Sequence, residues 1–214
     1  MNGEGRLTFA LAKGRLAEKA VELLERAGID CRALRDQGRR LVFEDERGET
    51  AFMLVKPADV ATYVDHGVAD LGIAGKDSLM EENRPLYEML DLGFGRCRLA
   101  LAGYPGTSLA GRHVRVATKY PFIAQELFSK RGCTYEIIRL NGSVELGPIV
   151  GLSDVILDIV ESGATLKANG LAVLEEICPV SARLVVNRVS LKTKAARIRP
   201  LIERLGGILG EGRQ

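Results

Sequence analysis

The sequence predicts an α/β protein with a largely parallel sheet, and two observations carry this prediction. First, short apolar runs of strand length alternate with segments of helical periodicity along the whole 214-residue chain. Second, glycine or proline turns separate these segments, without an internal repeat, a low-complexity segment or a linker rich in proline or serine. This alternation is typical of strand–helix–strand units, in which the helix returns the chain to start another parallel strand.

The N-terminal part begins with a buried strand at residues 6–12 and a tight turn. Apolar positions from Leu16 to Ala27 then recur at helical spacing, and Gly28 supplies the stop. The elements expected next are strands at 41–44 and 49–57, a helix over 59–67 that follows Pro57, and a strand, glycine turn and helix over 69–82.

The remainder of the chain continues the same alternation. The expected elements are strands within 96–106 and 113–121, a helix at 122–132, a strand at 134–142, a helix at 143–154, a strand at 155–160, a strand at 181–190 and a helix over 193–205. Pro200 should kink or split this last helix, because proline lacks the N–H that a helix interior requires. The best candidate boundaries are 88–95 and 178–181, which would suit a chain that crosses between two lobes twice.

The composition is typical of a soluble globular protein and excludes several classes of function. A net charge of +2 with 5% aromatic residues does not favour nucleic-acid binding. Four widely spaced cysteines indicate free thiols in a reducing cytoplasm rather than a zinc or disulfide framework. Two histidines are too few for histidine-based metal or triad chemistry, and no apolar run is long enough to span a membrane.

The most informative segment is the turn after the predicted strand at 155–160. Gly163 and Ala164 leave backbone N–H groups accessible, and Ser162 and Thr165 add hydroxyl donors at an expected helix start, which together favour a phosphate site. Asp158 and Glu161 suit sugar hydroxyls or a bound magnesium ion. The alternative interpretation is an ordinary strand-to-helix turn with a solvated glutamate.

Two further turns follow predicted strands, where ligands of α/β sheets bind. In Lys13-Gly14-Arg15 two cations stand at a helix start, which is electrostatically unfavourable unless an anion binds there. The segment 70–77 places glycines before a helix, but it matches neither of the nucleotide-binding spacings GxGxxG and GxxxxGK[ST]. Arg39 by itself is equally consistent with a solvated charge in a loop.

Taken together, these motifs resemble those of the ATP phosphoribosyltransferase family. Its signature, E-x5-G-x-[SAG]-x2-[IV]-x-D-[LIV]-x2-[ST]-G-x-T-[LM], is met here by Glu145, Gly151, Ser153, Ile156, Asp158, Ile159, Ser162, Gly163, Thr165 and Leu166. The segments LAKGRL, ADLGIAGKD, RVATKYP and NGLAVLE also resemble their family counterparts, so the resemblance extends from end to end.

The resemblance implies a fold and a reaction. The fold would be a two-lobed, periplasmic-binding-protein-like (type II) α/β fold with the active site in the interlobe cleft. Lobe I would comprise 1–90 and 180–214 on the ATP side, and lobe II, 91–179, would bind 5-phosphoribosyl 1-diphosphate. The reaction would join N1 of the ATP adenine to C1 of the sugar and release pyrophosphate, as the first step of histidine biosynthesis, with Mg²⁺ carried by the substrates rather than by protein side chains.

The resemblance also implies roles for individual residues. The catalytic cations would be Lys13, Arg15 and Arg39. The phosphoribosyl diphosphate site would comprise Glu145, Asp154, Asp158, Glu161, Ser162, Gly163, Ala164 and Thr165. The ATP site would comprise Lys13, Gly14, Arg15, Asp70, Leu71, Gly72 and Gly75.

The expected partners depend on where the chain stops. Longer family members continue into a regulatory domain that binds histidine, whereas this chain stops at Gln214. It therefore resembles the short form, for which a homodimer and a hetero-oligomer with a regulatory subunit resembling histidyl-tRNA synthetase are expected. No nucleic-acid or membrane partner is expected.

Two rival functions remain at this point. A non-catalytic ligand sensor of the same two-lobed shape would explain the strands but not a sugar-phosphate turn beside acids. A phosphoribosyltransferase of the commoner type would carry two adjacent acids and a T-G-G-T turn, whereas this chain has the single Asp158 and has Ala164 in place of the second glycine.

Overall fold

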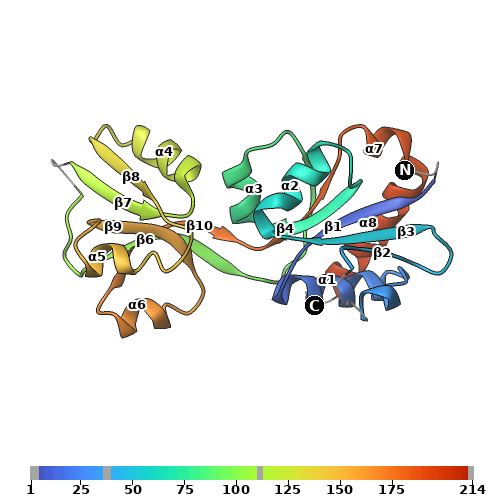
Figure 1. Ribbon diagram of the computed structural model, residues 1–214, viewed down its shortest axis with the longest axis horizontal. Coiled ribbons are helices and arrows are strands. Elements are labelled where there is room, and N and C mark those ends of the chain that lie inside the picture. The colour runs from blue at the N-terminus through green and yellow to red at the C-terminus, as the bar shows by residue number, and fades with distance from the viewer. Residues whose placement is uncertain (1–4, 36–39, 110–112, 212–214) are drawn as a thin grey trace. The chain divides into compact units, whose positions relative to one another are not determined.

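The computed structural model describes residues 5–35, 40–109 and 113–211. Within these ranges the chain divides into two compact units (Figure 1). Unit 1 contains the residues up to Gly95 and those from Ser181 onward, and unit 2 contains Arg96–Val180. The chain therefore passes from one unit to the other twice, once on each side of unit 2.

Unit 1 is built on a six-stranded mixed sheet with the order β2-β3-β1-β4-β11-β5. Its elements are β1 (Leu7–Ala12), α1 (Arg15–Arg26), the 3-10 helix η1 (Arg32–Leu34), β2 (Val42–Glu44), β3 (Thr50–Val55), α2 (Pro57–Asp65), β4 (Leu71–Gly75), α3 (Lys76–Glu82), β5 (Tyr87–Asp91), β11 (Ala182–Val186), α7 (Ser190–Thr193) and α8 (Ala195–Glu211). Strands β3, β1 and β4 are parallel to one another, whereas β2, β11 and β5 join the sheet in antiparallel pairs.

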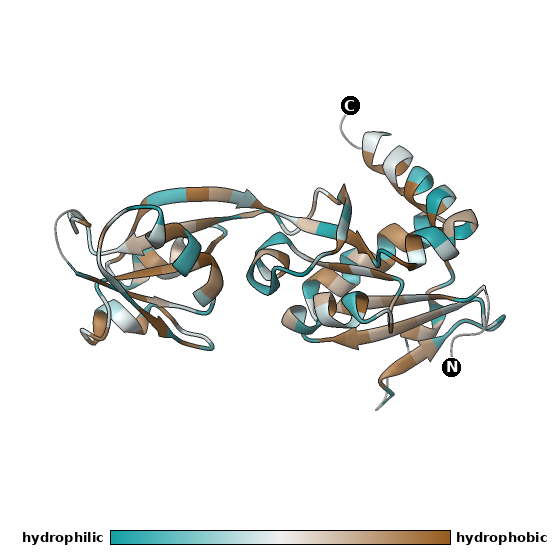
Figure 2. Cartoon of the chain, turned by 90° about the horizontal axis from the view of Figure 1, so that it is seen from above, coloured by the Kyte–Doolittle hydropathy of each residue, from teal (hydrophilic) through white to brown (hydrophobic). Residues whose placement is uncertain are grey.

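The two faces of this sheet are covered by different helices because the side chains of β1 alternate between them. Leu7, Phe9 and Leu11 pack in one core with buried residues of α1 and α8. Ala10 and Ala12 face a second core, which contains buried valines of α2. Figure 2 shows hydrophobic residues along the strands and alternating with hydrophilic ones along α8.

Unit 2 has a five-stranded mixed sheet with the order β10-β6-β9-β7-β8. Its elements are β6 (Cys97–Gly103), β7 (Val114–Thr118), α4 (Pro121–Ser129), β8 (Tyr135–Arg139), α5 (Leu146–Ile149), β9 (Val155–Val160), α6 (Ala164–Ala168) and β10 (Ala172–Val180). Strands β9, β7 and β8 are parallel, and β6 and β10 are antiparallel to their neighbours. Helix α4 lies on one side of this sheet and α5 and α6 on the other (Figure 1).

The predicted alternation of strands and helices is confirmed, but two expectations about it need correction. Both sheets are mixed rather than largely parallel, because the returning strands β10 and β11 pair antiparallel with β6 and β4. The border between the two units, Val180–Ser181, falls within the candidate boundary 178–181. Pro179 nevertheless lies inside β10, an edge strand, where a missing N–H is tolerated. Pro200 lies inside α8, which runs from Ala195 to Glu211, so it does not split the helix; the alternative expectation, a kink, stays a prediction.

A glycine in β4 allows α2 to pack closely on the sheet. A Cβ at Gly72 would lie 2.7 Å from a methyl carbon of Val64 and 2.8 Å from one of Val60. We expect Gly72→Ala to lower the free energy of unfolding by about 1–3 kcal/mol, the usual cost of overpacking. Urea denaturation measures this change. Gly207→Ala is the matched control: Gly207 lies in α8 with nothing within 4 Å of its Cβ position, so alanine should stabilise by about 0.5–1 kcal/mol.

Candidate functional site

The turn Ser162–Thr165, which the sequence suggested as a phosphate site, follows the carboxyl end of β9 in unit 2. Ser162, Ala164 and Thr165 are exposed, and the Ser162 hydroxyl oxygen accepts a hydrogen bond from the Ala164 N–H at 3.3 Å. Gly163 has φ 76° and ψ 7°, a left-handed conformation that side chains disfavour. The structure therefore presents small residues, hydroxyl groups and a glycine bend to solvent, as an anion-binding turn requires.

The helix after this turn contributes less than the sequence suggested. Helix α6 begins at Ala164 rather than at Thr165 and has only five residues. So short a helix has a small dipole, because the macrodipole sums over aligned peptide units. Any binding of an anion by this turn must therefore rest on its N–H and hydroxyl groups.

The carboxylates proposed for the sugar lie at different ends of the sheet. Asp158 lies in β9, half-buried, and its Oδ1 accepts a hydrogen bond from the Ile159 N–H at 2.9 Å. Glu145 precedes α5 on the connection that leaves the carboxyl end of β8, a strand that runs in the same direction as β7 and β9. Glu161 is exposed directly after β9. Glu145 follows β8, Glu161 follows β9, and Asp158 lies within β9. All three acids therefore belong to the part of unit 2 where the parallel strands reach their carboxyl edge.

Asp154 lies at the opposite, amino end of β9. Its carboxylate accepts hydrogen bonds from the Arg115 backbone N–H at 2.8 Å, from Nε at 3.3 Å and from Nη2 at 3.2 Å. This pairing raises the pKa of the Arg115 guanidinium. A six-residue strand spans about 20 Å, so Asp154 is too far from the turn to serve the same ligand. We do not carry it into the proposed site.

The signature residues consequently divide into two groups. Gly151 has φ 72° and supports a turn, Ser153 is buried, and Ile156 and Leu166 belong to the core of unit 2. The remaining residues lie in the turn or near the carboxyl edge of the sheet. Four of the ten signature residues therefore serve packing or a turn rather than ligand contacts.

In unit 1, the Lys13-Gly14-Arg15 turn also lies at the carboxyl edge of a sheet. Gly14 has φ 92°, and its carbonyl accepts the Ala17 N–H at 2.8 Å, which starts α1. The Lys13 N–H donates to the Val55 carbonyl at 2.9 Å, which ties the turn to the end of β3. Lys13 and Arg15 are both exposed.

Lys56 is a further basic residue at this edge that sequence reasoning missed. It follows β3 and precedes Pro57, the first residue of α2, and its side chain is exposed. Because β3 and β1 are parallel with Ala12 paired to Val55, the next residues of the two strands, Lys13 and Lys56, leave the sheet side by side. A lysine between a buried strand and a proline-initiated helix was the signal that could have identified it.

The other residues expected in the ATP site lie at different positions along β4, and they do not all reach the same edge of the sheet. Gly75 ends β4 at the same edge as the cations, and α3 starts directly after it. Leu71 and Gly72 lie inside β4 and are buried in packing. Arg39 lies outside the described residues.

Asp70 stands at the opposite end of β4 and has a structural environment. It is 2% exposed, and its carboxylate accepts hydrogen bonds from the Thr8 N–H at 2.9 Å, the Ser190 hydroxyl at 2.7 Å and Lys194 Nζ at 2.8 Å. It therefore connects β1, β4 and α7–α8 from the amino side of the sheet. We do not carry Asp70, Leu71 or Gly72 into the proposed site.

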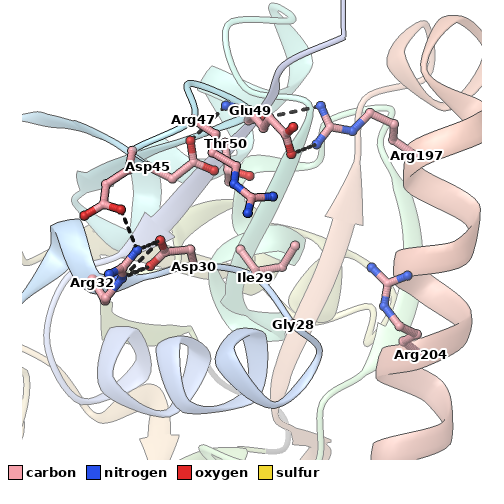
Figure 3. A pocket seen from close by; sticks show the side chains of 11 residues that line it. Gly28, Ile29, Asp30, Arg32, Asp45, Arg47, Glu49, Thr50, Arg197 and Arg204 are labelled. Carbon is pink, nitrogen blue, oxygen red and sulfur yellow. Dashed lines mark hydrogen bonds and ion pairs between the residues drawn. The ribbon is translucent and has the colours of Figure 1, made fainter.

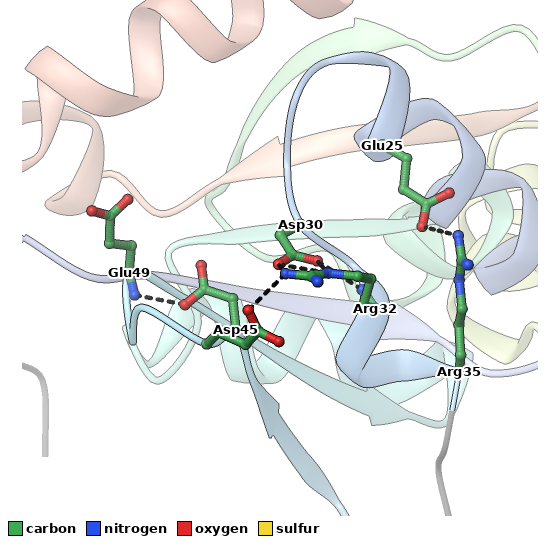
Figure 4. Close-up of polar contacts among 7 residues, drawn as sticks. Glu25, Asp30, Arg32, Arg35, Asp45 and Glu49 are labelled. Carbon is green, nitrogen blue, oxygen red and sulfur yellow. Dashed lines mark hydrogen bonds and ion pairs between the residues drawn. The ribbon is translucent and has the colours of Figure 1, made fainter.

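A charged pocket of about 470 Å³ lies at the amino edge of the unit 1 sheet (Figure 3). Its lining charges largely pair with each other. Arg32 contacts Asp30 at 2.7 Å, as Figure 4 shows, and it also contacts Glu46 at 2.9 Å. The hydrogen bonds from Arg32 lower the pKa of Asp30 to about 2, so this pair stays ionised at neutral pH. The pocket contains none of the residues expected to bind substrate among those the structure describes.

Three other features of the described ranges are informative. Within the described ranges, no group of three or more His, Cys, Asp or Glu side chains is placed to hold a metal ion. Burial raises the pKa of the Cys31 thiol to about 12, so it stays protonated at neutral pH and is no nucleophile. No described helix combines the length and apolar character needed to cross a bilayer.

Comparison with known proteins gives a consistent result. Residues 56–207 match the family model described as ATP phosphoribosyltransferase. The chain is 54% identical over 207 residues to ATP phosphoribosyltransferase from Caldanaerobacter subterraneus subsp. tengcongensis, which covers 96% of this chain and 99% of the relative. A relative with the same description from Ruminiclostridium cellulolyticum is 55% identical over 203 residues, covering 92% and 94%.

Solved structures agree in fold. The ATP phosphoribosyl transferase (HisG:HisZ) complex from Thermotoga maritima contains a chain that is 37% identical, with a TM-score of 0.85, covering 96% of this chain and 99% of that one. The periplasmic VFT2 domain of Bordetella pertussis BvgS has a TM-score of 0.57 at 14% identity and shows the shared two-lobed fold alone. The chain belongs to the ATP phosphoribosyltransferase family.

Proposed function

We propose that the two turns described above divide the substrates of the ATP phosphoribosyltransferase reaction between them. The turn Ser162–Thr165 of unit 2 holds the 5-phosphate of 5-phosphoribosyl 1-diphosphate, and the basic edge of unit 1 binds the phosphates of ATP and of the leaving group. The observation that carries this proposal is the exposed, glycine-bent Ser162-Gly163-Ala164-Thr165 turn at the end of β9, with Asp158 in the same strand.

The chemistry requires no protein base. The lone pair of adenine N1 forms the new bond to C1 of the sugar, and the electrons of the breaking C1–O bond leave with pyrophosphate. The transition state resembles an oxocarbenium ion, as in other displacements at glycosidic carbons, and negative charge grows on the diphosphate. Fixed cations at that developing charge should supply the largest share of the rate enhancement.

The acids have a different role from the cations. Asp158, together with Glu145 or Glu161, can accept hydrogen bonds from the ribose hydroxyl groups, since ionised carboxylates are acceptors only. They also fit Mg²⁺, which binds through one or two carboxylates, water and substrate phosphates rather than an all-protein cage. Bound Mg²⁺ would neutralise charge on the diphosphate.

The comparison with solved structures also supports a proposal about a hetero-oligomer. The Thermotoga maritima chain that this protein resembles was solved in a complex of HisG with HisZ. We propose that this chain forms a homodimer and a hetero-oligomer with a regulatory subunit of that kind in the cytoplasm, where histidine feedback acts through the partner. Light scattering of the chain alone and mixed with such a subunit tests this assembly.

Pyrophosphate release from ATP and 5-phosphoribosyl 1-diphosphate with Mg²⁺ tests the reaction. A ligand sensor of the same fold would bind without releasing pyrophosphate. Free adenine in place of ATP distinguishes the commoner phosphoribosyltransferases, which would accept the base. Failure to release pyrophosphate from ATP, with or without the regulatory subunit, would refute the proposal.

The turn itself is tested by Thr165→Val, which removes the hydroxyl group and keeps the shape. A hydrogen bond to a charged group contributes about 1.5–3 kcal/mol. We therefore expect the KM for 5-phosphoribosyl 1-diphosphate to rise about 10–100-fold, while the KM for ATP stays within twofold. Thr193→Val is the control, because its hydroxyl donates to the Val189 carbonyl at the amino side of unit 1.

A further inference from the structure

Lys119 lies in the segment RVATKYP, and no role has been assigned to its side chain. We propose that the Lys119 ammonium group binds a phosphate oxygen of 5-phosphoribosyl 1-diphosphate and so fixes the sugar against β9. This inference rests on the proposed function, because it assigns a further contact to the same substrate. Its basis is the position of Lys119, the way its backbone is held, and its local charge.

The strand pairing places Lys119 next to the acid proposed for the ribose. In the parallel pair of β7 and β9, Thr118 is opposite Leu157. The next residues of the two strands are therefore Lys119 and Asp158, and neighbouring strands lie about 4.8 Å apart. Lys119 thus emerges at the same edge of the sheet from which β9 continues into the turn Glu161–Thr165.

The backbone on both sides of Lys119 is fixed by buried groups. The Thr118 hydroxyl donates a hydrogen bond to the Leu157 carbonyl at 2.6 Å and accepts one from the Tyr120 N–H at 2.9 Å. Thr118 is fully buried and Tyr120 is 2% exposed. Thr118 thus connects the backbone on both sides of Lys119 to Leu157 of β9, the residue before Asp158. The backbone of Lys119 is therefore held in place on the sheet.

The side chain itself is exposed and held over an aromatic ring. Lys119 Nζ lies 4.7 Å from the centroid of the Tyr120 ring, a cation–π distance. Among the described residues, no carboxylate lies within ion-pair distance of this ammonium group. The ammonium is therefore positioned by a neutral ring and keeps its hydrogen-bond donors available.

The dipole of the helix that follows Lys119 opposes a cation at this position. Lys119 lies two residues before α4, a nine-residue helix that begins at Pro121 and has no acidic residue in its first turn. The amino end of a helix is positive, so a nearby lysine is repelled there. A substrate phosphate would remove this repulsion, whereas a lysine that only packs on Tyr120 would keep it.

The test compares Lys119→Met, which removes the charge and keeps the length, with Lys119→Arg, which keeps the charge. For Lys119→Met we expect the KM for 5-phosphoribosyl 1-diphosphate to rise about tenfold or more, with the KM for ATP within twofold of the original value, because a charge-assisted contact to one substrate is lost. Lys119→Arg should recover most of this loss. Lys130→Met is the matched control, since Lys130 is an exposed lysine at the other end of α4 that pairs with Glu126.

Product inhibition identifies which phosphate is bound. Ribose 5-phosphate carries only the 5-phosphate, and pyrophosphate represents only the leaving group. If Lys119 contacts the 5-phosphate, Lys119→Met weakens inhibition by ribose 5-phosphate alone; if it contacts the diphosphate, inhibition by pyrophosphate alone weakens. Either result supports the proposal.

Two results would overturn it. One is a KM for 5-phosphoribosyl 1-diphosphate in Lys119→Met that stays within twofold of the original; the other is an equal rise in Lys130→Met. Circular dichroism of both variants separates a binding defect from misfolding, and Lys119→Arg tests the charge if the methionine variant does not fold. Absence of pyrophosphate release from the unaltered protein would instead refute the proposed function, so the two failures are distinguishable.

Discussion

Arg15→Ala is expected to lower kcat about 10²–10³-fold while changing the KM for ATP much less. Arg15 is the first residue of α1, directly after the glycine bend at the carboxyl end of β1, and its side chain is exposed. If its guanidinium group meets the diphosphate as negative charge develops, it stabilises the transition state more than the bound substrates. Loss of one such donor costs about 10²–10³ in kcat in other enzymes.

Steady-state kinetics of pyrophosphate release measure this effect for both substrates. Arg26→Ala is the matched control, because Arg26 is an exposed arginine at the opposite end of the same helix. Its kcat should stay within twofold of the original. An unchanged kcat in Arg15→Ala would remove Arg15 from the catalytic residues, and a purely raised KM would assign it to substrate binding alone.

Asp70→Ala is expected to lower the free energy of unfolding by about 3–5 kcal/mol. The substitution leaves the Lys194 ammonium group, which is mostly buried, without the carboxylate that it contacts at 2.8 Å. It also removes the acceptor for the Thr8 N–H and the Ser190 hydroxyl. Removing one partner of a buried ion pair is costly because the other charge remains desolvated.

Urea denaturation followed by circular dichroism measures this loss. Glu126→Ala is the control, since it breaks the exposed pair with Lys130, and exposed pairs contribute about 0–1 kcal/mol. The KM for ATP should be unchanged in Asp70→Ala at low temperature, where the protein remains folded. A raised KM for ATP with unchanged stability would return Asp70 to the ATP site.

The elements could be predicted well because they depend on local periodicity. Strand β1 and helix α1 follow from consecutive apolar residues and from helical spacing that ends at Gly28. The strands β5 and β10 were missed. Each is an edge strand with exposed residues, so neither has the continuous apolar pattern of a buried strand. Edge strands are specified by the neighbour with which they pair, which lies far away in sequence.

The sequence by itself determined the alternation of strands and helices, the glycine bends at Gly14 and Gly163, and the chemical character of both turns. Only the tertiary structure decided which end of a strand each polar residue occupies. Asp70 and Gly75 are five residues apart, and Asp154 and Asp158 four, yet each pair is separated along a strand. Because an extended strand advances about 3.3 Å per residue, these few positions separate the edge that we propose to bind substrate from a structural ion pair.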